Sequence, residues 1–235
     1  MDFALTSEQR ELREMVRDFA QTEVAAAQKQ MDLDHEFPYD VWRKWGDLGM
    51  AGIMIPEEHG GSGLDSLSYI VAMEEMGTVS QTFALIWQVH VLVANMYVQL
   101  GTAAQKEKWL PAFARGDKLA AIGLTEPGAG SDAGGMRTRA VRDGDRGWCI
   151  NGSKIFISNA GTKISDGLVV MAVTGEKTPI EDIMEVLADP AIIYQTKVGG
   201  IGAFVSFMSR VGTLRNPPAN WRDMFFPEAF AGAGG

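Results

Sequence analysis

A stretch rich in glycine, Gly123–Gly135, is the feature that most restricts the fold of this 235-residue chain. Its glycines and its proline impose an irregular backbone, and Thr125, Ser131 and Asp132 place short polar groups around it. A loop of this kind directs backbone N–H groups and hydroxyls toward one ligand. The apolar run 119–124, which precedes it, is typical of a short buried strand. We therefore expect the loop to leave a strand end, where ligands commonly bind.

The glycine spacing does not match the common nucleotide-binding loops. Gly128, Gly130 and Gly134 miss the G-x-G-x-x-G pattern by one residue, and no helix-period pattern follows them. No Lys-Ser or Lys-Thr pair closes the stretch, as a P-loop requires. On glycine content alone, such a stretch is more often a purely structural turn than a ligand-binding loop. The order of its other residues has to distinguish these two interpretations.

The order Thr-Glu-Pro-Gly-Ala-Gly-Ser-Asp at 125–132 is more specific, and at every position it resembles the signature of the acyl-CoA dehydrogenase family. The segment 56–63 is similar to a second family segment, in which an aromatic residue usually stands at the position of His59. The run 101–116 also resembles the family. This resemblance extends from the N-terminus to about residue 173, after which the chain departs from the family pattern.

Helical periodicity dominates the first half of the chain. Residues 1–117 therefore predict an all-α helical bundle, similar to the family's N-terminal domain. Thr6 and Gln9 match a capping box, and we expect Pro38 at the first position of the second helix. The predicted helices run from Thr6 to near Lys29, and over 38–48, 67–76, 82–100 and 101–111.

Short apolar runs separated by turn residues follow the helices, so residues 118–174 predict the start of an antiparallel β domain and the fold class is α+β. Asn151-Gly152 between two such runs is a strong hairpin signal, because both residues tolerate positive φ. The runs expected as strands are 119–124, 137–142, 148–150, 154–158 and 166–173.

The family resemblance implies FAD bound between the β domain and the helical domains. An isoalloxazine ring has a polar edge and a broad apolar face, and negative charge accumulates at that edge when the flavin accepts a hydride. Backbone N–H groups and the Thr125 hydroxyl suit the polar edge, and in the family the position of Ser131 also reaches the CoA substrate. The positions that match this first flavin contact are Ile122, Gly123, Leu124, Thr125, Gly130 and Ser131.

The second flavin contact that the resemblance implies is the run Phe156, Ile157 and Ser158. The family usually has Trp at the position of Phe156, lying against the flavin, and Thr at the position of Ser158, bonding the flavin near N5. Phe keeps a stacking face and Ser keeps the hydroxyl. In a strand, alternation would place Phe156 and Ser158 on the same side, as one ligand requires.

The helix 82–100 corresponds to one that helps to wall the family's acyl-chain pocket. Ala84, Gln88 and Leu92 are the candidates for substrate contact, although core packing is the more common role for residues of such a helix. We retain Gln88, together with Ser131, as the substrate-binding prediction.

The reaction implied is α,β-dehydrogenation of an acyl-CoA thioester, with a carboxylate removing the α proton and a hydride passing to flavin N5. Electron transfer flavoprotein is the family's usual electron acceptor. The family's catalytic glutamate lies in a C-terminal helical domain, which residues 175–235 do not resemble; we expect them to form a partly disordered tail. We assign no catalytic residue and no metal ligand. Because a positioned base contributes about 10²–10⁴-fold, little turnover is expected from this chain alone.

Composition narrows the classes of partner. A net charge of −9 and a pI of about 4.9 argue against nucleic acid and anionic membranes. The single cysteine, Cys149, suits a reducing compartment, and the N-terminus has no basic leader. The stretch 79–105 lacks Asp, Glu, Lys and Arg, but polar residues interrupt it, so we expect a core helix rather than a membrane span. We expect a cytoplasmic protein that forms homo- or hetero-oligomers.

Three functions remain open on the sequence. The first is an FAD-dependent acyl-CoA dehydrogenase, truncated after its flavin-binding loops. The second is a non-catalytic FAD- and acyl-CoA-binding subunit of a heteromeric dehydrogenase. The third is a helical interaction module without flavin, in which the glycine-rich loops have only a structural role.

Overall fold

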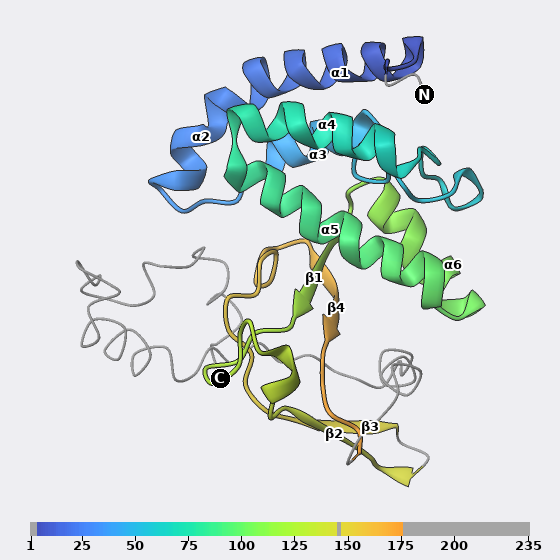
Figure 1. Ribbon diagram of the computed structural model, residues 1–235, viewed down its shortest axis with the longest axis vertical. Helices are drawn as coiled ribbons and strands as arrows, with labels where there is room; N and C mark the ends of the chain where they lie inside the picture. Colours follow the sequence, from blue (N-terminus) through green and yellow to red (C-terminus); the bar gives the residue numbers. More distant parts are fainter. Residues whose placement is uncertain (1–3, 145–146, 176–235) are drawn as a thin grey trace. The chain divides into compact units, whose positions relative to one another are not determined.

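The computed structural model describes residues 4–144 and 147–175, in which helices precede strands (Figure 1). The chain divides into two compact units after Ala120, here called the helical unit and the β unit. The expected tail lies outside the described residues, apart from Gly175. The helical unit contains α1 Ser7–Phe19, a π-helical segment Ala20–Val24, α2 Ala25–Asp32, α3 Tyr39–Asp47, a 3₁₀ turn Glu57–His59, α4 Ser66–Val79, α5 Gln81–Leu100 and α6 Ala103–Ala114. The strands are β1 Leu119–Gly123, β2 Arg139–Arg142, β3 Trp148–Asn151 and β4 Ser165–Val170, with a 3₁₀ turn at Ala133–Gly135.

Local capping sets where the helices begin. The capping box at α1 is confirmed, since the Thr6 hydroxyl accepts from the Gln9 N–H at 3.2 Å and the Gln9 side chain accepts from the Thr6 N–H at 3.1 Å. The prediction for Pro38 was wrong by one position. Pro38 has a ψ of 69°, outside the helical range, and caps α3, which begins at Tyr39. The first predicted helix continues beyond Lys29 to the end of α2.

Large aromatic side chains form the core of the helical unit. Trp45 meets Trp87 edge to face with ring centroids 5.0 Å apart. The indole N–H of Trp42 donates to the Gly116 carbonyl at 2.9 Å, and that of Trp87 donates to the Met50 carbonyl at 2.8 Å, so these two rings are buried with their polar atoms satisfied. The aromatic rings that are almost fully buried in this core are Phe37, Trp42, Trp45, Phe83, Trp87 and Phe113.

His90 is a polar group at the centre of this apolar core. It is completely buried, and its Nδ1 accepts from the Ala120 N–H at 3.1 Å. The proton must therefore be on Nε2, which donates to the Phe113 carbonyl at 3.1 Å. Burial lowers the pKa of His90 from 6.5 to about 4, against the smaller opposing effect of the Phe113 carbonyl. The neutral imidazole thus connects α5 with the end of α6 and with β1 at Ala120.

Helix α5 passes the length and composition test for crossing a membrane, and it is the one helix of the described residues that does. Half of its most apolar window is buried inside the protein, as in the core helix of a globular domain. Helix α4 packs against both α1 and α5, and α5 packs against α6 (Figure 1). These contacts account for the buried apolar residues of α5 within the helical unit.

The described part of the β unit contains two pairs of strands. β1 pairs with β4, and β2 pairs with β3 in an antiparallel ladder in which Arg139 lies opposite Asn151 and Arg142 opposite Trp148 (Figure 1). The predicted strands at 119–124 and 137–142 are confirmed within a few residues. β4 is shorter than predicted, and Val173 instead forms an isolated parallel bridge with Arg139.

The hairpin predicted at Asn151-Gly152 is wrong. The partner of β3 is the preceding strand β2, and between these two strands the Asp143 N–H donates to the Gly147 carbonyl at 2.8 Å. Gly144 and Gly147, which also lie between these strands, have positive φ values. Gly152 instead lies against Thr138, whose hydroxyl oxygen would be 2.3 Å from an added Cβ. Close packing, and not a turn, explains the glycine.

The predicted return strand, 154–158, is also wrong. This segment is irregular, and Phe156 has a left-handed φ of 55°. Strand alternation therefore does not place Phe156 and Ser158 on one side. The segment is held by other contacts, which are described with the candidate site.

We predict that His90 makes the helical unit sensitive to acid. The unfolded chain takes up a proton at His90 near pH 6.5 and the folded unit only near pH 4, so the free energy of unfolding should fall as the pH is lowered through this range, by up to about 1.4 kcal/mol per pH unit. Urea unfolding followed by tryptophan fluorescence at several pH values measures this slope.

A His90→Gln variant should have a lower stability at pH 7 and a shallower slope between pH 6.5 and 4. A His59→Gln variant, which changes a histidine in a surface loop, is the matched control and should keep the wild-type slope. Identical slopes for wild type and His90→Gln would contradict the assignment.

Candidate functional site

The carboxylate of Glu126 joins three segments of the β unit. Its side chain is only 6% exposed, and it accepts hydrogen bonds from the N–H groups of Arg137 at 2.6 Å and Thr138 at 2.8 Å. The Lys154 ammonium forms an ion pair with it at 2.9 Å. A buried carboxylate is tolerated only when it is paired and hydrogen-bonded in this way.

Lys154 completes the connection to the glycine-rich loop. Its side chain is 7% exposed, and besides Glu126 its Nζ donates to the Leu124 carbonyl at 2.8 Å. The adjacent N–H of Ile155 donates to the Thr125 carbonyl at 2.9 Å. A Cβ at Gly123 would lie 3.3 Å from Lys154 Cγ, so the glycine leaves room for the lysine stem. We call the bonds of Glu126 and Lys154 the Glu126–Lys154 clasp.

Electrostatics keep Glu126 ionised. Burial by itself would raise the pKa of Glu126, but hydrogen bonds from Thr138, Arg137 and Lys154 outweigh burial and lower the pKa from 4.5 to about 2. The carboxylate is therefore charged at neutral pH, with protein donors on both oxygens. Such a group holds structure together and is poorly suited to removing a proton from a substrate.

The two sequence segments predicted to contact a flavin are brought together by this clasp. Leu124, Gly130, Ser131 and Phe156 are exposed on the β unit, whereas Gly123 is buried. The remaining predicted residues, Ile122, Thr125, Ile157 and Ser158, are half-buried. The Ile155–Thr125 backbone bond sets the two segments side by side immediately before Phe156.

Three hydroxyls of these segments are available to a ligand. The hydroxyls of Thr125, Ser131 and Ser158 have no hydrogen-bond partner among residues 4–144 and 147–175. Each hydroxyl can donate one hydrogen bond and accept others. Ser158 is two residues after the exposed Phe156, and the Ile155–Thr125 backbone bond brings the Thr125 loop beside the same segment. Hydroxyls beside an exposed aromatic residue match the polar edge and apolar face of an isoalloxazine.

Phe156 combines strain with exposure. Its φ of 55° lies in the left-handed region, which a bulky side chain rarely adopts, and its side chain is 58% exposed. Strained backbone persists where surrounding structure enforces it, and it is concentrated at functional sites. Here the neighbouring Ile155 and Lys154 are fixed by the clasp, so the conformation of Phe156 is imposed from the adjacent residues.

The predicted acyl-pocket residues belong to the other unit, on α5. Ala84 is buried, as expected for core packing, but Gln88 and Leu92 are exposed. With Leu85 they form one face of α5 at spacings of three and four residues. The core-packing alternative is therefore wrong for Gln88 and Leu92, whereas a substrate contact for Gln88 stays a prediction.

Sequence reasoning missed Glu126 and Lys154 as site-forming residues. In the sequence, Glu126 stands out only as part of the Thr-Glu-Pro motif, and Lys154 only as part of an expected strand. An ionisable residue among apolar or glycine neighbours is the one local signal that could have drawn attention to them. Their pairing depends on tertiary structure.

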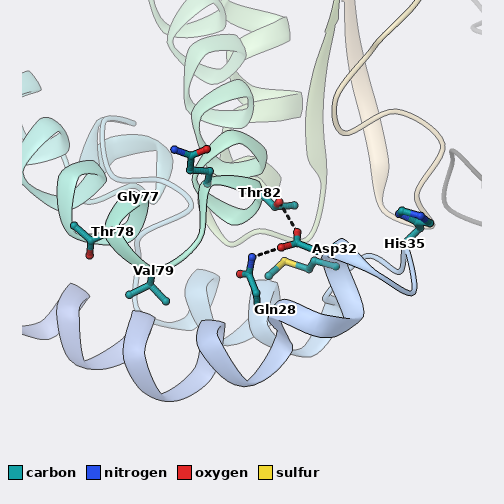
Figure 2. A pocket seen from close by; sticks show the side chains of 9 residues that line it. Gln28, Asp32, His35, Gly77, Thr78, Val79 and Thr82 are labelled. Carbon is teal, nitrogen blue, oxygen red and sulfur yellow. Dashed lines mark hydrogen bonds between the residues drawn. The ribbon is translucent and has the colours of Figure 1, made fainter. Parts of the chain in front are cut away.

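A polar cavity of about 720 Å³ lies between the end of α2 and the α4–α5 junction (Figure 2). Asp32 is its central charge, and its two carboxylate oxygens already accept from the Thr82 hydroxyl at 2.7 Å and from the Gln28 amide (Figure 2). Because the protein itself supplies these donors, we assign the cavity no ligand. His35, Gly77, Thr78, Val79, Gln81 and Met31 complete its lining.

Comparison with known proteins identifies the family. The model described as "Acyl-CoA dehydrogenase, N-terminal domain" matches residues 6–117, and the one described as "Acyl-CoA dehydrogenase, middle domain" matches 121–195. The second match extends past residue 173, where the sequence resemblance was expected to end.

Individual proteins give the same result. The chain is 46% identical over 175 residues to the short-chain specific acyl-CoA dehydrogenase of Clostridium acetobutylicum, covering 74% of this chain and 45% of that protein. It is similar to a chain in the structure of the electron transferring flavoprotein of Acidaminococcus fermentans, with a TM-score of 0.69 and 41% identity over 75% of this chain and 46% of that one. It is also similar to a glutaryl-CoA dehydrogenase from Mycobacterium smegmatis in complex with FADH2, with a TM-score of 0.67 and 32% identity over 73% of this chain and 44% of that one.

The chain spans about half the length of the relatives that it matches. The matched half contains the helical unit and the described strands, together with both segments that the Glu126–Lys154 clasp joins. On these two domain matches and on the likeness to solved structures, this chain belongs to the acyl-CoA dehydrogenase family.

Proposed function

We propose that this chain is the flavin-binding part of an FAD-dependent acyl-CoA dehydrogenase. The observation that carries the proposal is the exposed, strained Phe156 held beside the Thr125 loop by the hydrogen bonds of Lys154 and Ile155. A relative with 32% identity is known in complex with FADH2, which supports FAD as the cofactor here.

The residues of the β unit fit the two sides of an isoalloxazine. The Phe156 ring offers a face for stacking, the Thr125 hydroxyl offers a donor for the polar edge, and the Ser158 hydroxyl offers a donor near N5. When bound, the flavin supplies the capacity to accept a hydride from the β carbon of an acyl-CoA thioester. Donors of the Thr125 loop would lie where negative charge gathers on the polar edge of a reduced flavin. Ser131, exposed in the same loop, and Gln88 on α5 are the proposed contacts to the acyl-CoA substrate.

Removal of the substrate α proton needs a carboxylate that the clasp does not provide. Glu126 is buried, charged and already accepts from three protein donors. We propose that the base comes from outside the described residues, either from sequence that the longer relatives contain or from a partner subunit. This favours a second function as well: an FAD- and acyl-CoA-binding subunit of a heteromeric dehydrogenase.

The proposed electron acceptor is electron transfer flavoprotein, supported by the 41% identity to a chain in an electron transferring flavoprotein structure.

We also propose homo- or hetero-oligomeric assembly, since the exposed apolar face of α5, with Leu85 and Leu92, is suited to burial against another surface. A cytoplasmic location is proposed from the acidic composition and the single, unpaired Cys149.

The purified chain should bind FAD, and Phe156 should contribute to its retention. Phe156→Ala should weaken FAD binding by at least about tenfold, or 1.4 kcal/mol, through loss of the stacking face, and Thr125→Ala should weaken it less. Phe156→Trp should retain binding. Fluorescence titration with FAD measures these affinities, with Val141→Ala, at another exposed apolar residue of the β unit, as the control. Unchanged FAD affinity in Phe156→Ala would contradict the proposed site.

Phe156→Gly separates binding from stability. Glycine adopts a φ of 55° without strain, whereas other residues lose about 1–2 kcal/mol there. We therefore expect Phe156→Gly to be more stable to urea than Phe156→Ala by about 1 kcal/mol, while both bind FAD weakly. A parallel loss of stability and FAD affinity in both variants would indicate that Phe156 acts only in folding.

The FAD-loaded chain should not be reduced quickly by substrate. Without a positioned base, we expect flavin bleaching by butyryl-CoA under anaerobic conditions to be slower by about 10²–10⁴-fold than in a full-length relative. Stopped-flow absorbance at the flavin band measures the rate. Fast bleaching would mean that the chain contains a base outside the clasp, and would favour the active enzyme over the binding subunit.

A further inference from the structure

The Glu126–Lys154 clasp has a geometry that a purely local salt bridge would not need. Glu126 Oε1 accepts from both Thr138 N–H and Lys154 Nζ, and Oε2 accepts from Arg137 N–H. The clasp therefore ties the loop at 124–126 to the start of β2 and to the segment that leads to Phe156. The β2–β3 ladder already pairs Arg139, at the start of β2, with Asn151. In the described part of the β unit no strand includes the loop at 124–126, which the clasp and the Ile155–Thr125 backbone bond tie to the other two segments.

We propose that Glu126 and Lys154 are positioning residues for the flavin site, an inference that rests on the proposed function. Neither side chain is exposed enough to contact a bound ligand extensively. Their effect is on geometry: they fix the distance between the Thr125 loop and the Phe156–Ser158 segment. FAD affinity then depends on two residues that act through Thr125, Phe156 and Ser158.

Lys154 contributes more than charge neutralisation. Its Nζ also donates to the Leu124 carbonyl at 2.8 Å, so it holds the backbone of the residue next to Thr125. The Ile155–Thr125 backbone bond fixes only one point of contact, and a segment held at one point can still rotate about it. The lysine stem, packed against Gly123, adds the second and third points. Together they determine the direction in which Phe156 leaves the segment.

The pairing also explains why the strained φ of Phe156 is maintained. A residue in a disfavoured conformation relaxes unless its neighbours are fixed. Lys154 and Ile155, directly before Phe156, are both bonded to the loop at 124–126. Release of Lys154 should therefore allow the backbone at 156 to relax, with the ring moving away from the position that stacking requires.

The first test compares FAD affinity in wild type, Lys154→Met and the double variant Glu126→Gln/Lys154→Met. Lys154→Met should weaken FAD binding by about 10- to 100-fold, the range typical when a group that orients a metal-binding residue is removed, because FAD contacts would depend on orientation in the same way. It should also lose stability, because a buried carboxylate is left without its partner ion. Lys163→Met, at an exposed lysine of the same unit, is the control and should leave FAD affinity unchanged.

The double variant distinguishes positioning from stability. Removing both charges should restore part of the stability to urea, since no unpaired ion remains buried, although the introduced amide has only one acceptor oxygen for the N–H groups of Arg137 and Thr138. FAD affinity should stay low, because a methionine side chain has no donor to offer the Leu124 carbonyl. Recovery of FAD affinity together with stability would overturn the proposal, as would wild-type affinity in Lys154→Met.

A measurement on the wild-type chain covers the case in which the variants do not fold. If the clasp and the flavin site are coupled, FAD must stabilise the clasp reciprocally. Amide hydrogen exchange at Arg137 and Thr138, which lie outside the predicted flavin contacts, should slow when FAD is added. Unchanged exchange there, with FAD bound, would overturn the proposal.

These outcomes are separable from failure of the proposed function. If the wild-type chain fails to bind FAD, the proposed function is wrong, and the positioning role of Glu126 and Lys154, which depends on FAD binding, is wrong with it. If wild type binds FAD and Phe156→Ala weakens binding, but the clasp variants and the exchange of Arg137 and Thr138 show no effect, only the positioning role is wrong.

Discussion

A buried carboxylate that must be satisfied by protein donors organises the β unit. Glu126 is placed in the interior, where an unpaired charge would cost several kcal/mol. Two backbone N–H groups and one ammonium meet that requirement, and the ammonium comes from a different part of the chain than the N–H groups. The glycine-rich loop, the start of β2 and the segment before Phe156 are thereby fixed to one another.

The helical unit uses the same principle with a neutral group. His90 is buried among aromatic rings and would destabilise the core if either nitrogen lacked a partner. Its two ring nitrogens bond the end of α6 and the first residues of β1, and burial keeps the imidazole uncharged at neutral pH. Each unit therefore contains a buried polar side chain that connects segments distant in sequence.

Because Glu126 and Lys154 are paired in the interior of the β unit, the neighbouring Phe156 can keep a strained backbone and an exposed ring. Phe156 has a left-handed backbone and an exposed ring, neither of which favours folding, and it immediately follows residues held by the clasp. The hydroxyls of Thr125 and Ser158 likewise have no partner among the described residues. A flavin would use these groups, so the features that are unfavourable for stability are those that the proposed function requires.

The sequence by itself determined what depends on residues close together in the chain. The capping box at Thr6, the helices and β1 follow from local hydrogen bonds and apolar periodicity, and the motif at 125–132 placed the chain beside its family. Only the tertiary structure decided what depends on distant partners. Asn151-Gly152 has the local signal for a hairpin, yet β3 pairs with β2 because ladder bonds and the contact of Gly152 with Thr138 outweigh a turn preference. The Glu126–Lys154 pairing could not be read from residues so far apart in the chain, because a buried charge is matched to its partner only by folding.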